Sequence, residues 1–293
     1  MQPSGPDGRT REALLSTYLI AIVLAAALMH AGWNTIAKLN AARAGDAVIV
    51  GIMAAWPGVL VLPWAGVPDK AAWWQLTASV VIHFFYFRAL ARAYAGGELS
   101  VAYPLMRGVP PLVVAMFAAT VFGEALSVVA WSAVILLVAG VLLLGWDGML
   151  KHALRGNSAR FVLLQIAIIA TYTLIDGSGV RASGNALAYI VWMFVLTGAV
   201  LALAARSSLR ELEREGRSAL MVAAVGGLFT FGSYGVALWA MTHAPVALVA
   251  ALRETSILFG AGLGAWLLRE RFGARRWMAV AMILGGVAGM RLV

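Results

Sequence analysis

The sequence has no cysteine and few charged residues. Without cysteine, the chain cannot form disulfide scaffolds, thiolate nucleophiles, iron–sulfur clusters or cysteine-ligated zinc sites. Charged residues make up 12% of the 293 positions, whereas a soluble globular domain carries about 25%. Hydrophobic residues make up 62% of the chain. This composition excludes a water-soluble globule and predicts a protein that lies mostly within a membrane.

Apolar segments separated by short polar stretches follow one another along the chain. A membrane-spanning helix needs about 20 apolar residues, so the chain is long enough for ten. Because many comparable segments follow the first one, we expect that one to be retained and not cleaved as a signal peptide. Residues 206–218 are predicted to form a polar loop. The predicted helices are 16–36, 47–65, 72–94, 99–122, 127–146, 160–180, 186–205, 219–241, 246–268 and 274–291.

The second half of the chain matches the first half at a shift of 146 positions. The matched pairs are Arg107 with Arg253, Glu124 with Glu270, Trp131 with Trp277 and Gly140 with Gly286. Five helices in each half make the second half enter the membrane in the opposite direction. We therefore predict an all-α polytopic membrane protein whose ten transmembrane helices form two inverted five-helix repeats. The predicted parts are a polar tail (1–15), the first repeat (16–146), a connecting loop (147–159) and the second repeat (160–293).

Lysine and arginine are distributed unevenly between alternate loops. One set of loops and flanks carries fifteen of them: Lys38, Arg43, Arg88, Arg92, Lys151, Arg155, Arg160, Arg206, Arg210, Arg214, Arg217, Arg269, Arg271, Arg275 and Arg276. The other side carries Arg9, Arg11, Lys70, Arg181 and Arg291. The positive-inside rule makes the richer side cytoplasmic, which predicts periplasmic termini in a bacterial-type inner membrane. The net charge of +9 therefore indicates membrane topology and not nucleic-acid binding.

One long motif occurs in both halves. The segment ALRETSILFGAGLGAWLLRERFGARRWMAVAMILGGVAG, with the weaker echo YPLMRGVPPLVVAMFAATVFGEALSVVAWSAVILLVAGV, resembles the EamA repeat of the drug/metabolite transporter superfamily. The family's acidic turn, typically Gly-Glu-Arg, is replaced here by Gly123-Glu124-Ala125 and Arg269-Glu270-Arg271. The resemblance implies a transporter of small metabolites. The Tyr-Pro-Leu and Arg-Glu-Thr-Ser stretches and the aromatic-rich helices are similar, more narrowly, to YddG-type exporters of aromatic amino acids.

Only two acidic residues, Asp176 and Glu254, fall inside the predicted helices. An ionisable group in the bilayer interior costs on the order of 3 kcal/mol, which makes each a candidate functional residue. Asp176 lies near a helix end, so we expect it at the membrane interface. Glu254 lies about 12 Å into its helix and should face protein or water. Arg107 and Arg253 are expected near opposite leaflets, either anchored at the interface or paired with Glu254.

Prolines and aromatic residues suggest where a substrate could bind. Pro104, Pro110 and Pro111 remove backbone donors from one predicted helix, which predicts either an interrupted helix at a binding site or a plain kink. Aromatic side chains could stack on a ligand, although aromatics at helical spacing also serve core packing. The predicted substrate-binding residues are Trp33, Asn34, His83, Tyr86, Tyr103, Tyr172, Tyr234, Arg253 and Glu254.

These features favour a secondary exporter of small metabolites, with amino acids that carry aromatic side chains as the first choice. A multidrug or cationic-compound exporter is the alternative. An intramembrane enzyme is a remote one, because Ser178 is its only nucleophile-like residue. A non-transporting scaffold would lack a central polar cavity. We expect no cofactor, no metal and no nucleic acid, and the expected partners are a small-molecule substrate and the lipid bilayer around a monomer.

Overall fold

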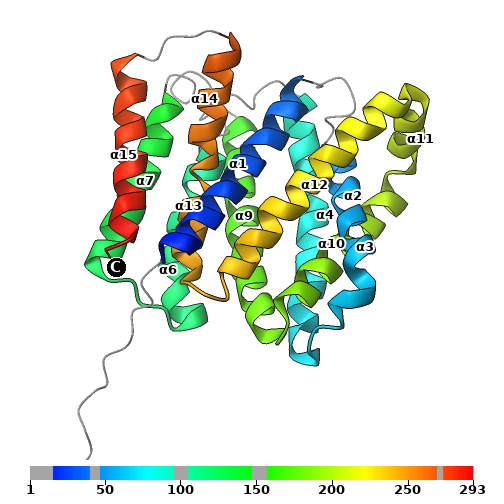
Figure 1. The fold of residues 1–293 in the computed structure, drawn as a ribbon, viewed down its shortest axis with the longest axis horizontal. Helices are drawn as coiled ribbons and strands as arrows, with labels where there is room; N and C mark the ends of the chain where they lie inside the picture. The colour runs from blue at the N-terminus through cyan, green and yellow to red at the C-terminus, as the bar shows by residue number, and fades with distance from the viewer. Residues whose placement is uncertain (1–15, 40–46, 96–104, 147–156, 269–272, 293) are drawn as a thin grey trace, which may run out of the picture.

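The structure is a computed structural model that describes residues 16–39, 47–95, 105–146, 157–268 and 273–292. Most of these residues are helical, and the helices lie side by side in one bundle (Figure 1). In chain order the helices are α1 (Thr17–Leu39), α2 (Ala47–Met53), α3 (Ala55–Ala65), the 3-10 helix η1 (Lys70–Ala72), α4 (Trp73–Ala95), α6 (Pro110–Phe122), α7 (Val128–Leu144), α9 (Asn157–Ala182), α10 (Ala186–Ala204), α11 (Arg206–Glu215), α12 (Arg217–Ala240), α13 (Val246–Arg253), α14 (Ser256–Leu268) and α15 (Ala274–Met290).

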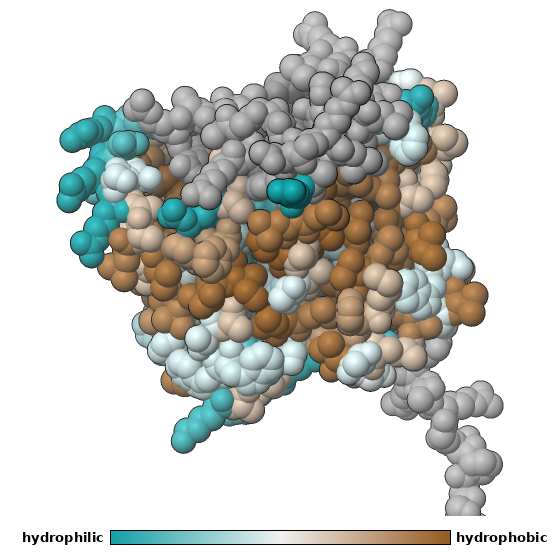
Figure 2. Space-filling view, turned by 180° about the vertical axis from the view of Figure 1, so that it is seen from behind, coloured by the Kyte–Doolittle hydropathy of each residue, from teal (hydrophilic) through white to brown (hydrophobic). Residues whose placement is uncertain are grey.

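Helices occupy all ten ranges that the sequence predicts as helical. Within the described residues, seven segments are long and apolar enough to cross a membrane. The apolar helix α7 is shorter, with 17 residues, and α4 and α15 occupy the remaining two predicted ranges. Figure 2 shows a broad hydrophobic band across the middle of one face, with hydrophilic residues towards the two ends. The chain is thus an all-helical protein with several potential membrane crossings, and the count of ten crossings stays a prediction.

The helix prediction is wrong at three places, one of which is the range 47–65, where α2 ends at Met53 and α3 begins at Ala55. The predicted polar loop contains α11, an amphipathic helix whose Leu212 is buried against Ile49 and Ala223. The apolar partners of Leu212 belong to α2 and α12, so the local sequence alone does not reveal that this segment has a surface to pack on. The predicted helix 246–268 is not continuous, because α13 ends at Arg253 and α14 begins at Ser256.

Several helix bounds repeat along the chain. Helix α6 begins at Pro110 and α14 begins 146 positions later, at Ser256. The same offset relates α7 to α15, which have 17 residues each. This offset is the one at which the sequence halves align.

Helices α7 and α15 pack closely against each other through glycines. A Cβ atom on Gly140 would lie 2.9 Å from the carbonyl oxygen of Ala279, and one on Gly286 would lie 2.8 Å from that of Ala133. These two contacts are equivalent at the 146-residue offset, because Gly140 corresponds to Gly286 and Ala133 to Ala279. Contacts of this reciprocal kind relate the two helices by a local two-fold axis and make them antiparallel. Any side chain larger than hydrogen at either glycine would push the helices apart.

The turns that the sequence assigns to one side of the membrane do lie together at one end of the bundle. The Asp69 N–H donates to the Ser183 carbonyl at 3.0 Å, and the Asn185 side chain donates to the Ala65 carbonyl at 3.0 Å. Helix α15 ends at this same end, whereas α11 lies at the opposite end (Figure 1). The grouping of these loops agrees with the charge argument. Which end faces the cytoplasm stays a prediction.

Candidate functional site

Two interrupted helices meet inside the bundle. Helix α6 begins at Pro110, and Pro110 and Pro111 supply no N–H to the carbonyl oxygens four residues earlier. Between α13 and α14, the N–H groups of Glu254 and Thr255 bond back only three residues, as in a tight turn. Both interruptions break the regular helical hydrogen-bond pattern beside charged side chains.

A buried ion pair joins the two interruptions. Arg107 Nε lies 3.0 Å from Glu254 Oε2, and each side chain is only 4% exposed. We call this contact the central ion pair. The sequence suggests opposite leaflets for Arg107 and Arg253, and this expectation is wrong, because the helix interruptions bring Arg107 to the residue next to Arg253. Of the two alternatives for the arginines, the structure shows pairing with Glu254 for Arg107.

A second polar group surrounds Asp176, which lies on α9. Asp176 is fully buried, and its carboxylate accepts hydrogen bonds from Tyr234 Oη at 2.6 Å and Tyr189 Oη at 2.9 Å. The guanidinium of Arg253 lies 4.7 Å from the centre of the Tyr234 ring. Asp176 is therefore enclosed by protein, and its place at the membrane interface stays a prediction. Its two tyrosine partners come from α10 and α12, which the spacing along α9 could not reveal.

Aromatic rings connect this carboxylate to the rest of the bundle. The His83 ring centre lies 4.7 Å from that of Tyr172 and 5.6 Å from that of Tyr234. The Tyr86 ring lies 5.5 Å from Tyr172. The backbone carbonyl of Ser79 is 3.0 Å from His83 Nδ1, which holds the imidazole in place. We call His83, Tyr86, Tyr172 and Tyr234 the aromatic cluster.

A small cavity lies beside the central ion pair. Its volume of about 10 Å³ is space for about one water molecule. Trp33 on its wall donates from Nε1 to His30 Nδ1 at 3.2 Å. We call it the central cavity, and it is lined by His30, Trp33, Asn34, Tyr86, Leu90, Met106, Arg107, Gln165 and Ile169.

The structure brings most of the predicted site residues into one continuous region. Trp33, Asn34 and Tyr86 line the central cavity, and Glu254 pairs with its wall residue Arg107. The remaining described ones belong to the aromatic cluster or touch it: His83, Tyr172, Tyr234 and Arg253. Tyr103 lies outside the described residues. Sequence reasoning missed Gln165 as a site residue, and the only signal for it is a lone amide within the apolar run FVLLQIAIIA.

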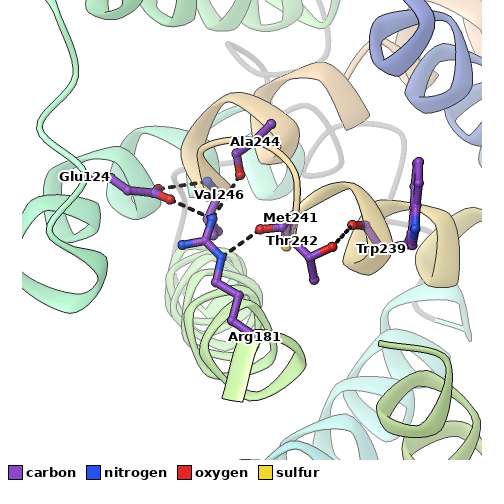
Figure 3. Close-up of polar contacts among 7 residues, drawn as sticks. All are labelled: Glu124, Arg181, Trp239, Met241, Thr242, Ala244 and Val246. Atoms are coloured by element: carbon purple, nitrogen blue, oxygen red, sulfur yellow. Dashed lines mark hydrogen bonds and ion pairs between the residues drawn. The ribbon is translucent and has the colours of Figure 1, made fainter. Parts of the chain in front are cut away.

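A third polar group ties three turns together at the end of the bundle (Figure 3). Arg181 Nη2 lies 2.6 Å from Glu124 Oε1, and Glu124 Oε2 accepts the backbone N–H of Val246 at 2.9 Å. Arg181 also donates to the carbonyls of Met241 at 2.7 Å and Ala244 at 2.9 Å. We call the Arg181–Glu124 contact the loop-face ion pair. The acidic turn of the sequence motif therefore connects α6 to the ends of α9 and α12 and to the start of α13.

The described residues contain no cluster of metal-ligating side chains. Among the described residues, no three histidine, aspartate or glutamate side chains come together as metal ligands would. The chain also lacks cysteine. Of the buried charges described above, Arg107 and Glu254 pair with each other and Asp176 accepts from two hydroxyl groups, whereas Arg253 lies over the Tyr234 ring.

Comparison with known protein families finds a match for the second half of the chain. Residues 158–292 match the EamA-like transporter family. Residues 158–292 are similar to this family, and we call them the EamA-like domain. The family belongs to the drug/metabolite transporter superfamily and consists of transporters, not enzymes.

Comparison with solved structures extends the likeness to nearly the whole chain. One crystal structure of a protein has a TM-score of 0.69 and 18% sequence identity, and the match covers 94% of this chain and 98% of the other. At this identity the likeness shows a shared fold only. A comparison with curated proteins found no match.

The candidate site lies between the EamA-like domain and the first half of the chain. The EamA-like domain contributes Asp176, Tyr234 and Glu254, whereas the first half contributes Tyr86 and Arg107. The central ion pair therefore crosses from one half to the other. A relative movement of the two halves would change this contact directly.

Proposed function

We propose that the protein is a secondary transporter of the inner membrane that exports small metabolites by alternating access. The observation that carries this proposal is the central ion pair, which is buried between the EamA-like domain and the first half of the chain. A buried charge pair inside a membrane bundle is costly, and such groups typically mark substrate or ion pathways. The pair also lies where two helices are interrupted, which is typical of transporter binding sites.

Alternating access requires two units that rock against each other around the site. We take residues 16–146 and 160–293 as these units, related as inverted five-helix repeats. The starts of α6 and α14, which are 146 positions apart, support this division. The equal lengths of α7 and α15 and the reciprocal glycine contacts between them support it too. In the conformation described, the central cavity has room for about one water, so a metabolite would enter only after the units move.

Amino acids with aromatic side chains are the proposed substrates. Arg107, Arg253 and Glu254 offer both signs of charge beside the aromatic cluster, which suits a zwitterion with an aromatic ring. The narrower resemblance of the sequence to YddG-type exporters points the same way. An exporter of permanent cations is the alternative, since aromatic rings and a glutamate also suit cations.

Flux measurements in liposomes separate these substrates. The full chain is reconstituted, and uptake of labelled tryptophan is measured with tyrosine, phenylalanine, a sugar and a quaternary ammonium compound as competitors. We expect saturable tryptophan flux that tyrosine and phenylalanine inhibit. Transport of the quaternary ammonium compound without inhibition by any aromatic amino acid would replace the amino-acid proposal with the cation exporter. Absence of saturable flux of every compound would contradict transport itself.

Glu254 is the candidate for coupling export to a proton gradient. A carboxylate that changes partners as access alternates could take up a proton on one side and release it on the other. We expect an imposed pH difference to drive accumulation by the wild type, whereas Glu254→Gln should support exchange only. Flux that ignores both pH and protonophores would make the protein a facilitator whose export follows the cytoplasmic concentration.

A further inference from the structure

One buried side chain in the central cavity lacks the partners that buried polar groups normally have. Gln165 on α9 is 1% exposed and lines the cavity. Within the described residues, neither its Nε2 nor its Oε1 has a hydrogen-bond partner. An amide buried in this way pays its desolvation cost without compensation, so such groups in native proteins call for an explanation.

The neighbours of Gln165 are already engaged. Arg107 is paired with Glu254, and Trp33 Nε1 donates to His30. The side-chain amide of Asn34 donates to the His30 carbonyl at 2.9 Å. Gln165 therefore presents both an unused donor and an unused acceptor to the same small space.

Three other buried uncharged side chains of the described residues do not show this combination. Gln75 has one orphaned atom, Oε1, and Thr197 and Ser256 each have one hydroxyl without a partner among the described residues. None of these three lines the central cavity. Gln165 differs from them in having two unsatisfied groups next to an aromatic wall and an arginine.

We propose that Gln165 binds the head group of an α-amino acid, with Nε2 donating to the carboxylate and Oε1 accepting from the ammonium group. This inference rests on the proposed transport function and names a residue that recognises the transported substrate. An α-amino acid carries an acceptor and a donor on one carbon atom, which matches the two ends of one amide. Arg107 is close enough to favour the carboxylate, and the rings of Trp33 and Tyr86 form the apolar wall for the side chain.

Because the central cavity is small, Gln165 can contact an amino acid only after the cavity widens. A space of about 10 Å³ excludes an amino acid, so binding needs α1, α9 and the segment before α6 to move apart. In the conformation described, the two unsatisfied polar atoms of Gln165 destabilise the empty protein. A bound substrate would supply their missing hydrogen bonds. Replacing Gln165 with methionine, which has a similar length and no polar group at its end, should not weaken the empty protein.

The test uses Gln165→Met in the full chain, with Gln75→Met as the matched control. The probes are tryptophan, tryptamine, which lacks the carboxylate, and indole-3-propionate, which lacks the ammonium group. Competition for tryptophan flux in liposomes gives the preference of each variant, and thermal unfolding without ligand gives its stability. We expect the wild type and Gln75→Met to prefer tryptophan to both analogues, and Gln165→Met to lose about tenfold of that preference. We also expect Gln165→Met to unfold at the same or a higher temperature than the wild type.

The possible outcomes separate the two proposals. If the wild type prefers tryptophan and Gln165→Met keeps that preference, the assignment of Gln165 is wrong while the transport proposal stands. A lower unfolding temperature for Gln165→Met also overturns the assignment, because it means that the amide supports the empty structure. If the wild type does not distinguish the three probes, the amino-acid proposal and the head-group contact are both wrong.

Discussion

The two ion pairs of this protein have opposite environments. The central ion pair has side chains that are 4% exposed, whereas those of the loop-face ion pair are 29% exposed for Arg181 and 18% for Glu124. A buried pair is not screened by water, and removing one partner leaves an uncompensated charge that costs about 3–5 kcal/mol. A partly exposed pair can be hydrated when it opens, so its contribution is small. Under the proposed transport function, we expect the first pair to define the site and the second to open and close.

The largest effect is expected from Glu254→Gln. This change keeps the shape of the side chain but leaves Arg107 without its charged partner, so we expect proton-driven accumulation of the substrate to fall on the order of a hundredfold. The matched control is Glu213→Gln on the exposed side of α11, which should stay within about twofold of the wild type. Flux assays of both variants in liposomes decide this. Equal effects of the two changes would show that burial does not distinguish these carboxylates.

The coupling within the central ion pair can be measured separately from transport. Arg107→Met and Glu254→Met should each lower the free energy of unfolding by about 3–5 kcal/mol, because each leaves one buried charge alone. The double variant has no buried charge at this point and should be more stable than either single variant. Thermal unfolding of the wild type, the two single variants and the double variant gives the four values of this double-mutant cycle. Additive losses would mean that the two side chains do not interact.

The two tyrosines that bond Asp176 offer a smaller and more selective comparison. Tyr189→Phe and Tyr234→Phe each remove one hydrogen bond to a charged group, so each should destabilise the protein by about 1.5–3 kcal/mol. Tyr234 also belongs to the aromatic cluster and lies under Arg253, so Tyr234→Phe, which releases this ring from Asp176, should in addition raise the KM for tryptophan. Thermal unfolding and flux measured on both variants test whether the two changes share the stability loss but differ in KM. The same KM change in both would place Tyr189 in the substrate path as well.

Arg181→Met should have a smaller effect, because the loop-face ion pair is partly exposed. We expect it to open this end of the bundle and to change flux by a few-fold, with little loss of stability. The absence of cysteine allows spin labels at Ala125→Cys and His243→Cys, two exposed positions on either side of the pair. The distance between the labels should lengthen in Arg181→Met. An unchanged distance would show that the bundle end is held closed by its other contacts.

Reporter fusions test the orientation of the bundle and should leave transport unaffected. A reporter after Val293 should give a periplasmic signal, and one within the Arg206–Ser218 segment should give a cytoplasmic signal. The reverse pattern would overturn the charge-based orientation without affecting the grouping of loops at the two ends of the bundle.

The sequence predicts the ten helical ranges because each apolar run satisfies its backbone hydrogen bonds locally and needs no distant partner. For the segment before α6, the sequence predicts either an interruption or a plain kink, since Pro110 and Pro111 lack two backbone donors. The turn between α13 and α14 has no such residue, and the sequence suggests a continuous helix there. The sequence did not predict the amphipathic helix α11, because its Leu212 packs on residues of α2 and α12 that are distant in the chain.

The sequence by itself determined which side chains are too polar for lipid, and Glu254 could be singled out because a lone carboxylate deep in an apolar run is costly. It could not determine their partners. Arg107 and Glu254 are 147 positions apart, and the tyrosines of Asp176 come from two other helices, so only the crossing of the helices decided which charges meet. Gln165 is the clearest case, because an amide in an apolar helix is unremarkable until the fold encloses it in a cavity and leaves both of its polar atoms without partners among the described residues.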